Sequence, residues 1–146
     1  MMQVSSRFAD NGDGTVADNK TGLIWIREDI WQRENRWVTY DEAKEYVINL
    51  AHGKFAGKNI WRLPSIKEAL SLYDESLANK DKYGNTIYLP PIFPEGSQAT
   101  VWCEEPSTGN DGYTVDFRNG KVGTLYKSKC PRMSARAVFG ESLITL

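Results

Sequence analysis

The chain has 146 residues and a formal net charge of −1, with an isoelectric point near 5.9. This length predicts one domain spanning residues 1–146, with flexible ends at 1–6 and 140–146. The balanced charge argues against nucleic acid or an anionic membrane surface as a partner. Since no apolar run approaches ~18 residues, we expect no membrane insertion.

The composition favours a turn-rich domain. Aromatic residues make up 12% of the chain, and there are 12 glycines. This suits an α+β domain better than a helical bundle. The first six residues have neither the basic start nor the apolar core of a signal peptide. The residues alone leave open a cytosolic protein or one whose leader has been removed.

The two cysteines, Cys103 and Cys130, are too few for a structural zinc site, because the chain has one histidine, His52. A disulfide between them would stabilise the fold by roughly 3.5 kcal/mol on the chain-entropy estimate. Two unrelated buried thiols are the alternative. The sequence favours neither.

Residues 7–19 predict a β-hairpin, because Asn11-Gly12 and Asp13-Gly14 supply the positive φ angles of a tight turn. A calcium-binding loop is the alternative. In that register Ala9 and Lys20 fall at the two positions where an EF-hand needs carboxylates. The turn is therefore preferred, and calcium has only weak support.

Residues 23–26 form a continuous apolar run, which is typical of a strand buried on both faces. The polar segment that follows carries Trp31 and ends near Trp37. These two rings either form a contact surface or cover the helix that follows, and the second interpretation is favoured.

Two capping boxes, Thr39 with Glu42 and Ser65 with Glu68, predict two helices. The first helix is expected over 40–51, where apolar residues recur at helical spacing. The second begins at about Ser65 and ends between 74 and 77.

Residues 78–98 look irregular and contain several Pro, Gly and Asn residues. A loop of about 20 residues in a compact domain is usually functional or folded on itself. We expect four apolar side chains to tether it to the core: Ile87, Leu89, Ile92 and Phe93. The strands predicted after it are 99–104, 113–117, 122–126 and 134–139, with a hairpin turn at 118–121.

No catalytic constellation is present, since the chain lacks a nucleophile elbow, a phosphate-cradling loop and a dinucleotide fingerprint. The chain is therefore predicted not to be an enzyme and to need no cofactor. Four acidic residues, Glu104, Glu105, Asp111 and Asp116, surround one loop and could gather a cation or sugar hydroxyls. An ordinary solvated acidic loop is the alternative.

A hairpin block over 7–25, the run Trp61–Ser65 with Glu68, and the strands around Trp102 and 113–120 follow one another along the chain. In this order they resemble the Lcl C-terminal domain, a bacterial family named after a collagen-like adhesin. The resemblance extends over about residues 7–139.

The resemblance implies a C-type-lectin-like fold: two helices packed on a small twisted antiparallel sheet, with a long loop region. It also implies a secreted or cell-surface protein, with the cytoplasm as the alternative location. The chain departs from the family pattern at Cys103-Glu104, where two serines are usual, and lacks the cysteines of the first helix and of the last strand. A Cys103–Cys130 bridge would then substitute for the family's disulfide.

The function implied is a non-enzymatic, lectin-like module that binds a glycan or a protein macromolecule. One alternative is an oligomeric assembly subunit of a surface or fibre protein. A less favoured one is a formylglycine-generating-like enzyme that uses the two cysteines. The predicted ligand-binding residues are Trp31, Tyr83, Tyr88, Glu104, Glu105, Asn110, Asp111 and Tyr113. Five of them are expected to surround one concavity: Trp31, Tyr83, Tyr88, Glu105 and Tyr113.

The remaining predictions concern stability. Seven side chains are expected in the core: Trp25, Trp61, Leu63, Trp102, Val115, Phe117 and Val138. Arg62 is expected to pair with a carboxylate or backbone carbonyls and not to bind a ligand.

Overall fold

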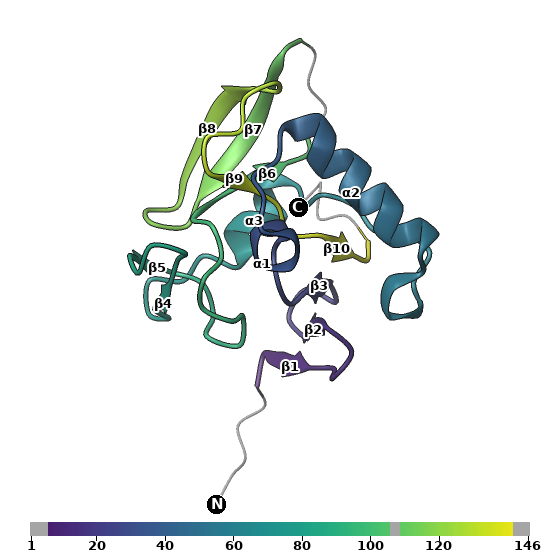
Figure 1. The fold of residues 1–146 in the computed structure, drawn as a ribbon. Coiled ribbons are helices and arrows are strands. Elements are labelled where there is room, and N and C mark those ends of the chain that lie inside the picture. Colours follow the sequence, from purple (N-terminus) through teal and green to yellow (C-terminus); the bar gives the residue numbers. More distant parts are fainter. Residues whose placement is uncertain (1–5, 106–108, 142–146) are drawn as a thin grey trace, which may run out of the picture.

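The computed structural model describes residues 6–105 and 109–141, and Figure 1 shows their arrangement. The helices are α1 (Ile30–Glu34), α2 (Tyr40–His52), the 3-10 turn η1 (Phe55–Gly57) and α3 (Ile66–Ser71). The strands are β1 (Phe8–Asp10), β2 (Thr15–Asp18), β3 (Ile24–Ile26), β4 (Asn79–Lys80), β5 (Thr86–Ile87), β6 (Thr100–Cys103), β7 (Asp111–Asp116), β8 (Lys121–Tyr126), β9 (Met133–Ser134) and β10 (Val138–Phe139).

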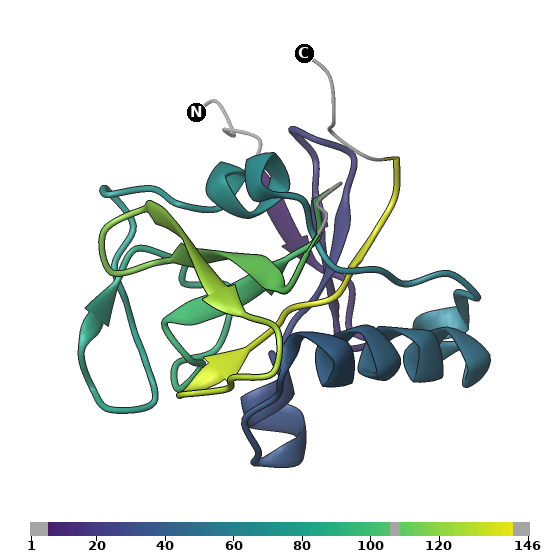
Figure 2. The same cartoon turned by 90° about the horizontal axis from the view of Figure 1, so that it is seen from above.

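The molecule is a mixed α and β domain with few helices and several small sheets. One four-stranded sheet has the order β1-β2-β3-β10, another has the order β8-β7-β6-β9, and β4 pairs with β5 alone. The β4–β5 hairpin lies beside the second of these sheets, at the end of the molecule far from α2 (Figures 1 and 2). None of the helices described here is long and apolar enough to cross a membrane.

The single closing strand predicted over 134–139 is wrong, because this segment divides between the two large sheets. Met133 and Ser134 pair in parallel with β6, while Val138 and Phe139 pair antiparallel with β3. Between them Arg136 is 4% exposed and donates hydrogen bonds to the carbonyl oxygens of Ile26 and Arg27. This inward-pointing side chain links the segment between β9 and β10 to the end of β3. The chain passes from one large sheet to the other within this segment.

Capping explains where the helices begin. The boxes predicted at Thr39 and Ser65 are both present, so α2 and α3 start where the sequence indicated. The sequence prediction missed α1, whose capping box joins Asp29 and Gln32. Its five residues are too few to show a helical hydrophobic period.

The core consists of two clusters, and β6 contributes to both. Val101 and Cys103 pack in one cluster with Trp25, while Trp102 packs in the other beside α2. Alternate side chains of a strand point to opposite faces, which explains this division. All seven predicted core residues are buried, and the Trp102 indole donates to the Val38 carbonyl at 2.9 Å.

The predicted pairing of Arg62 with a carboxylate and a backbone carbonyl is confirmed. Its Nη1 and Nη2 donate to the two carboxylate oxygens of Glu68, each at 2.7 Å, and Nη2 also donates to the Gly140 carbonyl. The Glu68 side chain is fully buried and also accepts from the Ser65 backbone N–H. This network joins the strand-like segment before α3 to the last part of the chain.

The two cysteines are free thiols and no disulfide joins them. Cys103 is buried in the cluster around Trp25, whereas Cys130 packs against the cluster around Trp102. Since the side chains of Trp102 and Cys103 leave β6 on opposite faces, the two thiols belong to different halves of the core. A bridge between them, left open by the sequence, is therefore absent from this structure.

Candidate functional site

The predicted ligand-binding residues occupy several separate places. The aromatic pair Trp31 and Tyr83 comes together, with Lys82 Nζ lying 5.2 Å from the Trp31 ring centroid and 5.9 Å from that of Tyr83. Tyr88 instead packs edge to face against Tyr73, with ring centroids 5.9 Å apart. Tyr113 lies on β7 and packs against the Trp25 cluster.

The two adjacent acidic residues after β6 bond within the fold. Glu105 accepts a hydrogen bond at 2.6 Å from the backbone N–H of Ile66, the first residue of α3. Glu104 forms an ion pair with Lys44 of α2. Both carboxylates therefore tie the loop that follows β6 to helices α2 and α3.

Asn110 and Asp111 lie at the start of β7, the end of this strand far from Arg118. Asn110 lines an open hollow of about 340 Å³ together with Asp41, Tyr126, Lys127 and Ser128. Asp111 is exposed and pairs across the sheet with Tyr126. This hollow is a second surface feature, separate from the place where Trp31 and Tyr83 meet.

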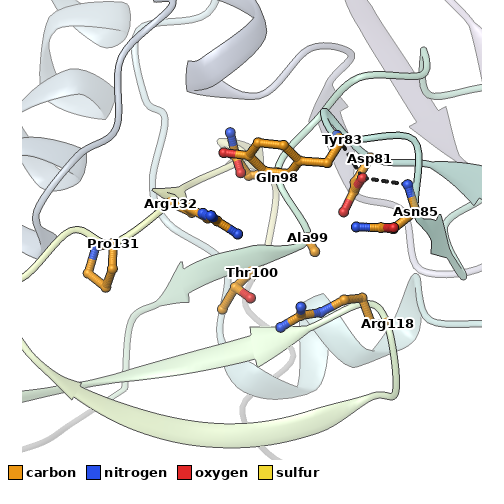
Figure 3. Close-up of a pocket in the computed structure, with 9 residues that line it drawn as sticks. All are labelled: Asp81, Tyr83, Asn85, Gln98, Ala99, Thr100, Arg118, Pro131 and Arg132. Atoms are coloured by element: carbon orange, nitrogen blue, oxygen red, sulfur yellow. Dashed lines mark hydrogen bonds between the residues drawn. The ribbon is translucent and has the colours of Figure 1, made fainter.

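A better-defined pocket of about 170 Å³ lies at the β4–β5 hairpin, shown in Figure 3. The hairpin turn is held by Asp81, whose Oδ1 accepts from the backbone N–H groups of Tyr83 and Asn85 at 2.8 and 2.9 Å. Short polar side chains favour such turns because they replace a backbone acceptor. The Asp81 turn thereby presents Tyr83, which is 45% exposed, at the rim.

Ser97 and Gln98 connect the β4–β5 hairpin to the N-terminus of α1. Lys82 N–H donates to the Ser97 carbonyl at 2.7 Å, and Gln98 N–H donates to Asp29 Oδ2 at 2.9 Å. Asp29 is buried, and burial raises the pKa of its carboxyl despite the nearby positive charge of Arg136. Through Asp29 the N-terminus of α1 is tied to the pocket.

The side chain of Gln98 lines the pocket and is 2% exposed. Its Nε2 has no hydrogen-bond partner, and the neighbouring Ser97 Oγ is likewise buried without one. Leaving a buried donor unsatisfied costs about 1–3 kcal/mol, so such groups in native proteins call for an explanation. Here the unsatisfied donor belongs to a pocket wall.

Two arginines complete the wall. Arg118 is held by Asp116 in the β7–β8 turn, with Nη2 at 2.8 Å from Oδ2, and this carboxylate raises the pKa of the guanidinium. Arg132 has a left-handed backbone (φ 55°), and its guanidinium carbon lies 4.8 Å from the centroid of the Tyr83 ring. Among the residues that the structure describes, the Arg132 side chain has no ion pair or hydrogen bond.

The pocket continues into a line of alternating rings and cations. Trp37, 42% exposed, stacks on Trp31 with centroids 6.2 Å apart, and Lys82 bridges Trp31 to Tyr83, which Arg132 covers on the pocket side. We call these five residues the aromatic–basic row. Aromatic faces and cations attract each other, so each ring orders the charged side chain next to it.

The comparison with protein families identifies the chain. The model of the Lcl C-terminal domain matches residues 14–138. The chain belongs to the Lcl C-terminal domain family. The matched span includes every residue that lines the pocket and the whole aromatic–basic row. No curated protein and no solved structure matches the chain.

In this Lcl C-terminal domain, sequence reasoning found Trp31 and Tyr83 but missed most of the pocket. The irregular segment 78–98 was the useful signal, because it supplies Asp81, Asn85 and Gln98. Nothing in the local sequence marks Arg118 or Arg132, which come from a hairpin turn and from the segment before β9.

The domain offers little for metal or thiol chemistry within the described ranges 6–105 and 109–141. No group of three or more His, Cys, Asp and Glu side chains there could hold a metal ion. The turn at Asp13 uses its carboxylate to accept from Thr15 N and Oγ1, as the hairpin interpretation requires. Burial raises the pKa of the Cys103 thiol, which suppresses the nucleophilic thiolate.

Proposed function

We propose that this Lcl C-terminal domain is a non-enzymatic, C-type-lectin-like binding module. Its ligand is a glycan or another macromolecule, and it works at a cell surface or after secretion. The single observation that supports this most directly is the pocket beside Tyr83. There a partly exposed ring adjoins a buried amide and a guanidinium, and neither group is fully paired within the part of the chain that the structure describes.

The chemistry of the pocket suits carbohydrate. Sugar rings present apolar C–H faces that pack on aromatic side chains, and their hydroxyls both donate and accept hydrogen bonds. Tyr83 supplies the face, Asp81 an acceptor, and Asn85 and Gln98 amides that do both. The lining is mainly polar with Tyr83 as its aromatic wall, and converging polar groups of this kind fix the orientation of a ligand.

The absence of a reactive constellation in the described residues supports binding without chemistry. The pocket contains no histidine or cysteine. Cys103, the thiol that a formylglycine-generating-like reaction would need, is buried on β6, where the raised pKa keeps it protonated.

The test is a glycan-array screen of the purified chain, in calcium and in a chelator, with Tyr83→Ala compared with Tyr126→Ala. Tyr126 is a matched control because it is 57% exposed and lies in the other hollow. Saturable binding that Tyr83→Ala weakens and Tyr126→Ala preserves would support the pocket. Binding that only Tyr126→Ala weakens would place the site in the hollow with Asn110.

One observation favours an assembly subunit as a second candidate. The strand β8 ends its sheet and exposes Val122 and Tyr126, which are 45% and 57% exposed. An edge strand with apolar side chains is suited to pairing with another chain. If light scattering detects a defined oligomer that Val122→Lys dissociates, and the array detects no ligand, assembly becomes the better account.

A further inference from the structure

We propose that the Tyr83 pocket accepts a single terminal sugar ring that bears a carboxylate. This inference rests on the proposed binding function and specifies the ligand class of that same site. It follows from three properties of the pocket: its volume, the charge of its walls, and the buried amide of Gln98.

The volume limits the ligand to one ring. At about 170 Å³ the pocket is near the ~150 Å³ of an engineered cavity that holds one benzene molecule. Pockets for drug-sized ligands start at roughly 300 Å³. A six-membered sugar ring matches this space. Because the pocket opens to solvent, the terminal ring of a chain can occupy it while the remaining rings stay outside.

One cation of the pocket wall is available to an anionic ligand group. Three ionised side chains line the pocket: Asp81, Arg118 and Arg132. Arg118 already pairs with Asp116, and Asp81 holds the hairpin turn. Arg132 remains as the cation without a carboxylate partner among the described residues, beside the Tyr83 ring. Arg132 is exposed, so its guanidinium is available to pair with a negative group on the ligand.

The shape of the available donors favours a carboxylate. A guanidinium is planar and presents its N–H groups as a fork that matches the two oxygens of a carboxylate. The Gln98 amide is also planar, lacks a partner for Nε2 and lines the same pocket. In Figure 3 the Gln98 amide and the Arg132 guanidinium are drawn on the same side of the pocket, near the outer end of the Tyr83 side chain. A ligand carboxylate placed there would give Nε2 the acceptor that it lacks.

The Gln98 donor has a second consequence for specificity. A site that leaves a buried donor unpaired discriminates strongly against ligands that lack the matching acceptor. A neutral sugar with a hydroxymethyl group in place of the carboxylate leaves Arg132 without its counter-charge. The pocket should therefore separate an acidic sugar from its neutral counterpart more sharply than it separates sugars that differ in one hydroxyl.

The experiment measures binding of methyl glycosides by calorimetry to the wild-type chain. The probes are the methyl glycosides of glucuronic acid, galacturonic acid and N-acetylneuraminic acid, each compared with its carboxylate methyl ester. We expect at least one acid to bind, and its ester to bind roughly 10- to 100-fold more weakly, which is the usual range for hydrogen bonds to a charged group.

The variants assign the effect to the two donors. Arg132→Gln should weaken the acid roughly 10- to 100-fold and leave the ester unchanged. Gln98→Leu should weaken the acid about tenfold while the thermal melting temperature is kept. Lys121→Gln removes one positive charge from β8, outside the pocket, and serves as the matched charge control. Its affinity for the acid should equal that of the wild type.

Two results would overturn the inference while leaving the binding function intact. One is array binding of neutral sugars or peptides that Tyr83→Ala abolishes and Arg132→Gln does not affect. The other is binding of long acidic polysaccharides in proportion to their length and not to their number of chain ends. If Tyr83→Ala changes no binding at all, the proposed function itself fails at this pocket.

Discussion

Around the start of α3, Arg62, Glu68 and Ser65 bond to one another, whereas at the Tyr83 pocket Gln98 and Arg132 are left without comparable partners. Both regions place polar side chains inside the same small domain. The first network joins the chain segment before α3 to Gly140, so its groups stabilise the fold. The second region has polar groups that the fold does not use, which is what a binding site requires.

This difference has an energetic reason. A buried charge is tolerated when a partner and additional hydrogen bonds replace the water it has lost. Glu68 satisfies this condition with two bonds from Arg62 and one from the Ser65 N–H. An amide such as Gln98 is neutral, so leaving one of its donors unmatched costs far less than an unmatched charge. A binding site can therefore keep such a donor free for a ligand.

The strongest way to test this contrast is Arg62→Ala. The change removes the ion pair of Arg62 with the fully buried Glu68 carboxylate, so we expect a loss of about 3–5 kcal/mol in the free energy of unfolding. Urea denaturation measures it. Arg118→Ala is the matched control, because its side chain is 54% exposed and its ion pair should contribute at most about 1 kcal/mol. Equal effects of the two variants would contradict the distinction.

A closer comparison uses two buried amides. Asn79 Nδ2 donates to the carbonyl oxygens of Pro90 and Phe93 at 3.3 and 2.8 Å, whereas Gln98 Nε2 has no acceptor among the described residues. We expect Asn79→Leu to cost about 1–3 kcal/mol of stability, since it removes the donor to the Phe93 carbonyl and leaves the Pro90 carbonyl with the Phe93 N–H as its donor. Gln98→Leu should change stability by less than about 1 kcal/mol in either direction. Thermal and urea unfolding of both variants measure these changes. A large loss in the free energy of unfolding for Gln98→Leu would show that this residue stabilises the fold.

The smallest effect concerns pH. Burial by itself would raise the pKa of Asp18, but the ion pair with Arg7 and the hydrogen bonds from Thr21 and the Lys20 N–H lower it below 3.8. A carboxyl whose pKa is lowered in the folded state stabilises the protein above the unfolded pKa of about 3.9. This contribution is lost as the pH falls through the folded value. Asp18→Asn should therefore be less stable than the wild type at pH 7, by about 1–2 kcal/mol.

The pH series itself supplies the check. The difference in unfolding free energy between wild type and Asp18→Asn should shrink below about pH 4. Asp29 provides a contrast of opposite sign, because burial raises its pKa. For Asp29→Asn the stability of the wild type relative to the variant should increase as the pH falls toward 4. A pH-independent difference at Asp18 would show that its ion pair with Arg7 contributes little.

The sequence predicted those parts of the fold that depend on local chemistry. The capping boxes at Thr39 and Ser65, the hairpin near Asp13 and the seven core residues all lie where expected. Each depends on neighbours a few residues away or on the hydrophobicity of one side chain. Family membership was also recognisable, because the hairpin block and the run around Trp61 are contiguous in the chain.

The sequence revealed only part of the candidate site, because the partners of its polar side chains are distant in the chain. Glu104 and Glu105 form an acidic pair in sequence, yet Lys44 and the N–H of Ile66 bond to them from elsewhere in the chain. The location of the two cysteines also depends on tertiary structure. The local sequence does not say where either thiol packs, whereas in the fold Cys103 lies in one core cluster and Cys130 packs against the other.

The sequence by itself thus determined where α2, α3 and the first hairpin begin, seven of the buried side chains and which family the chain resembles, because these follow from short-range hydrogen bonding and hydrophobicity. Tertiary structure alone decided which polar groups remain unpaired. Whether Arg132 finds a carboxylate, or Gln98 Nε2 an acceptor, depends on segments that are distant in the chain and meet only in the folded molecule. The pocket beside Tyr83 forms where these segments meet.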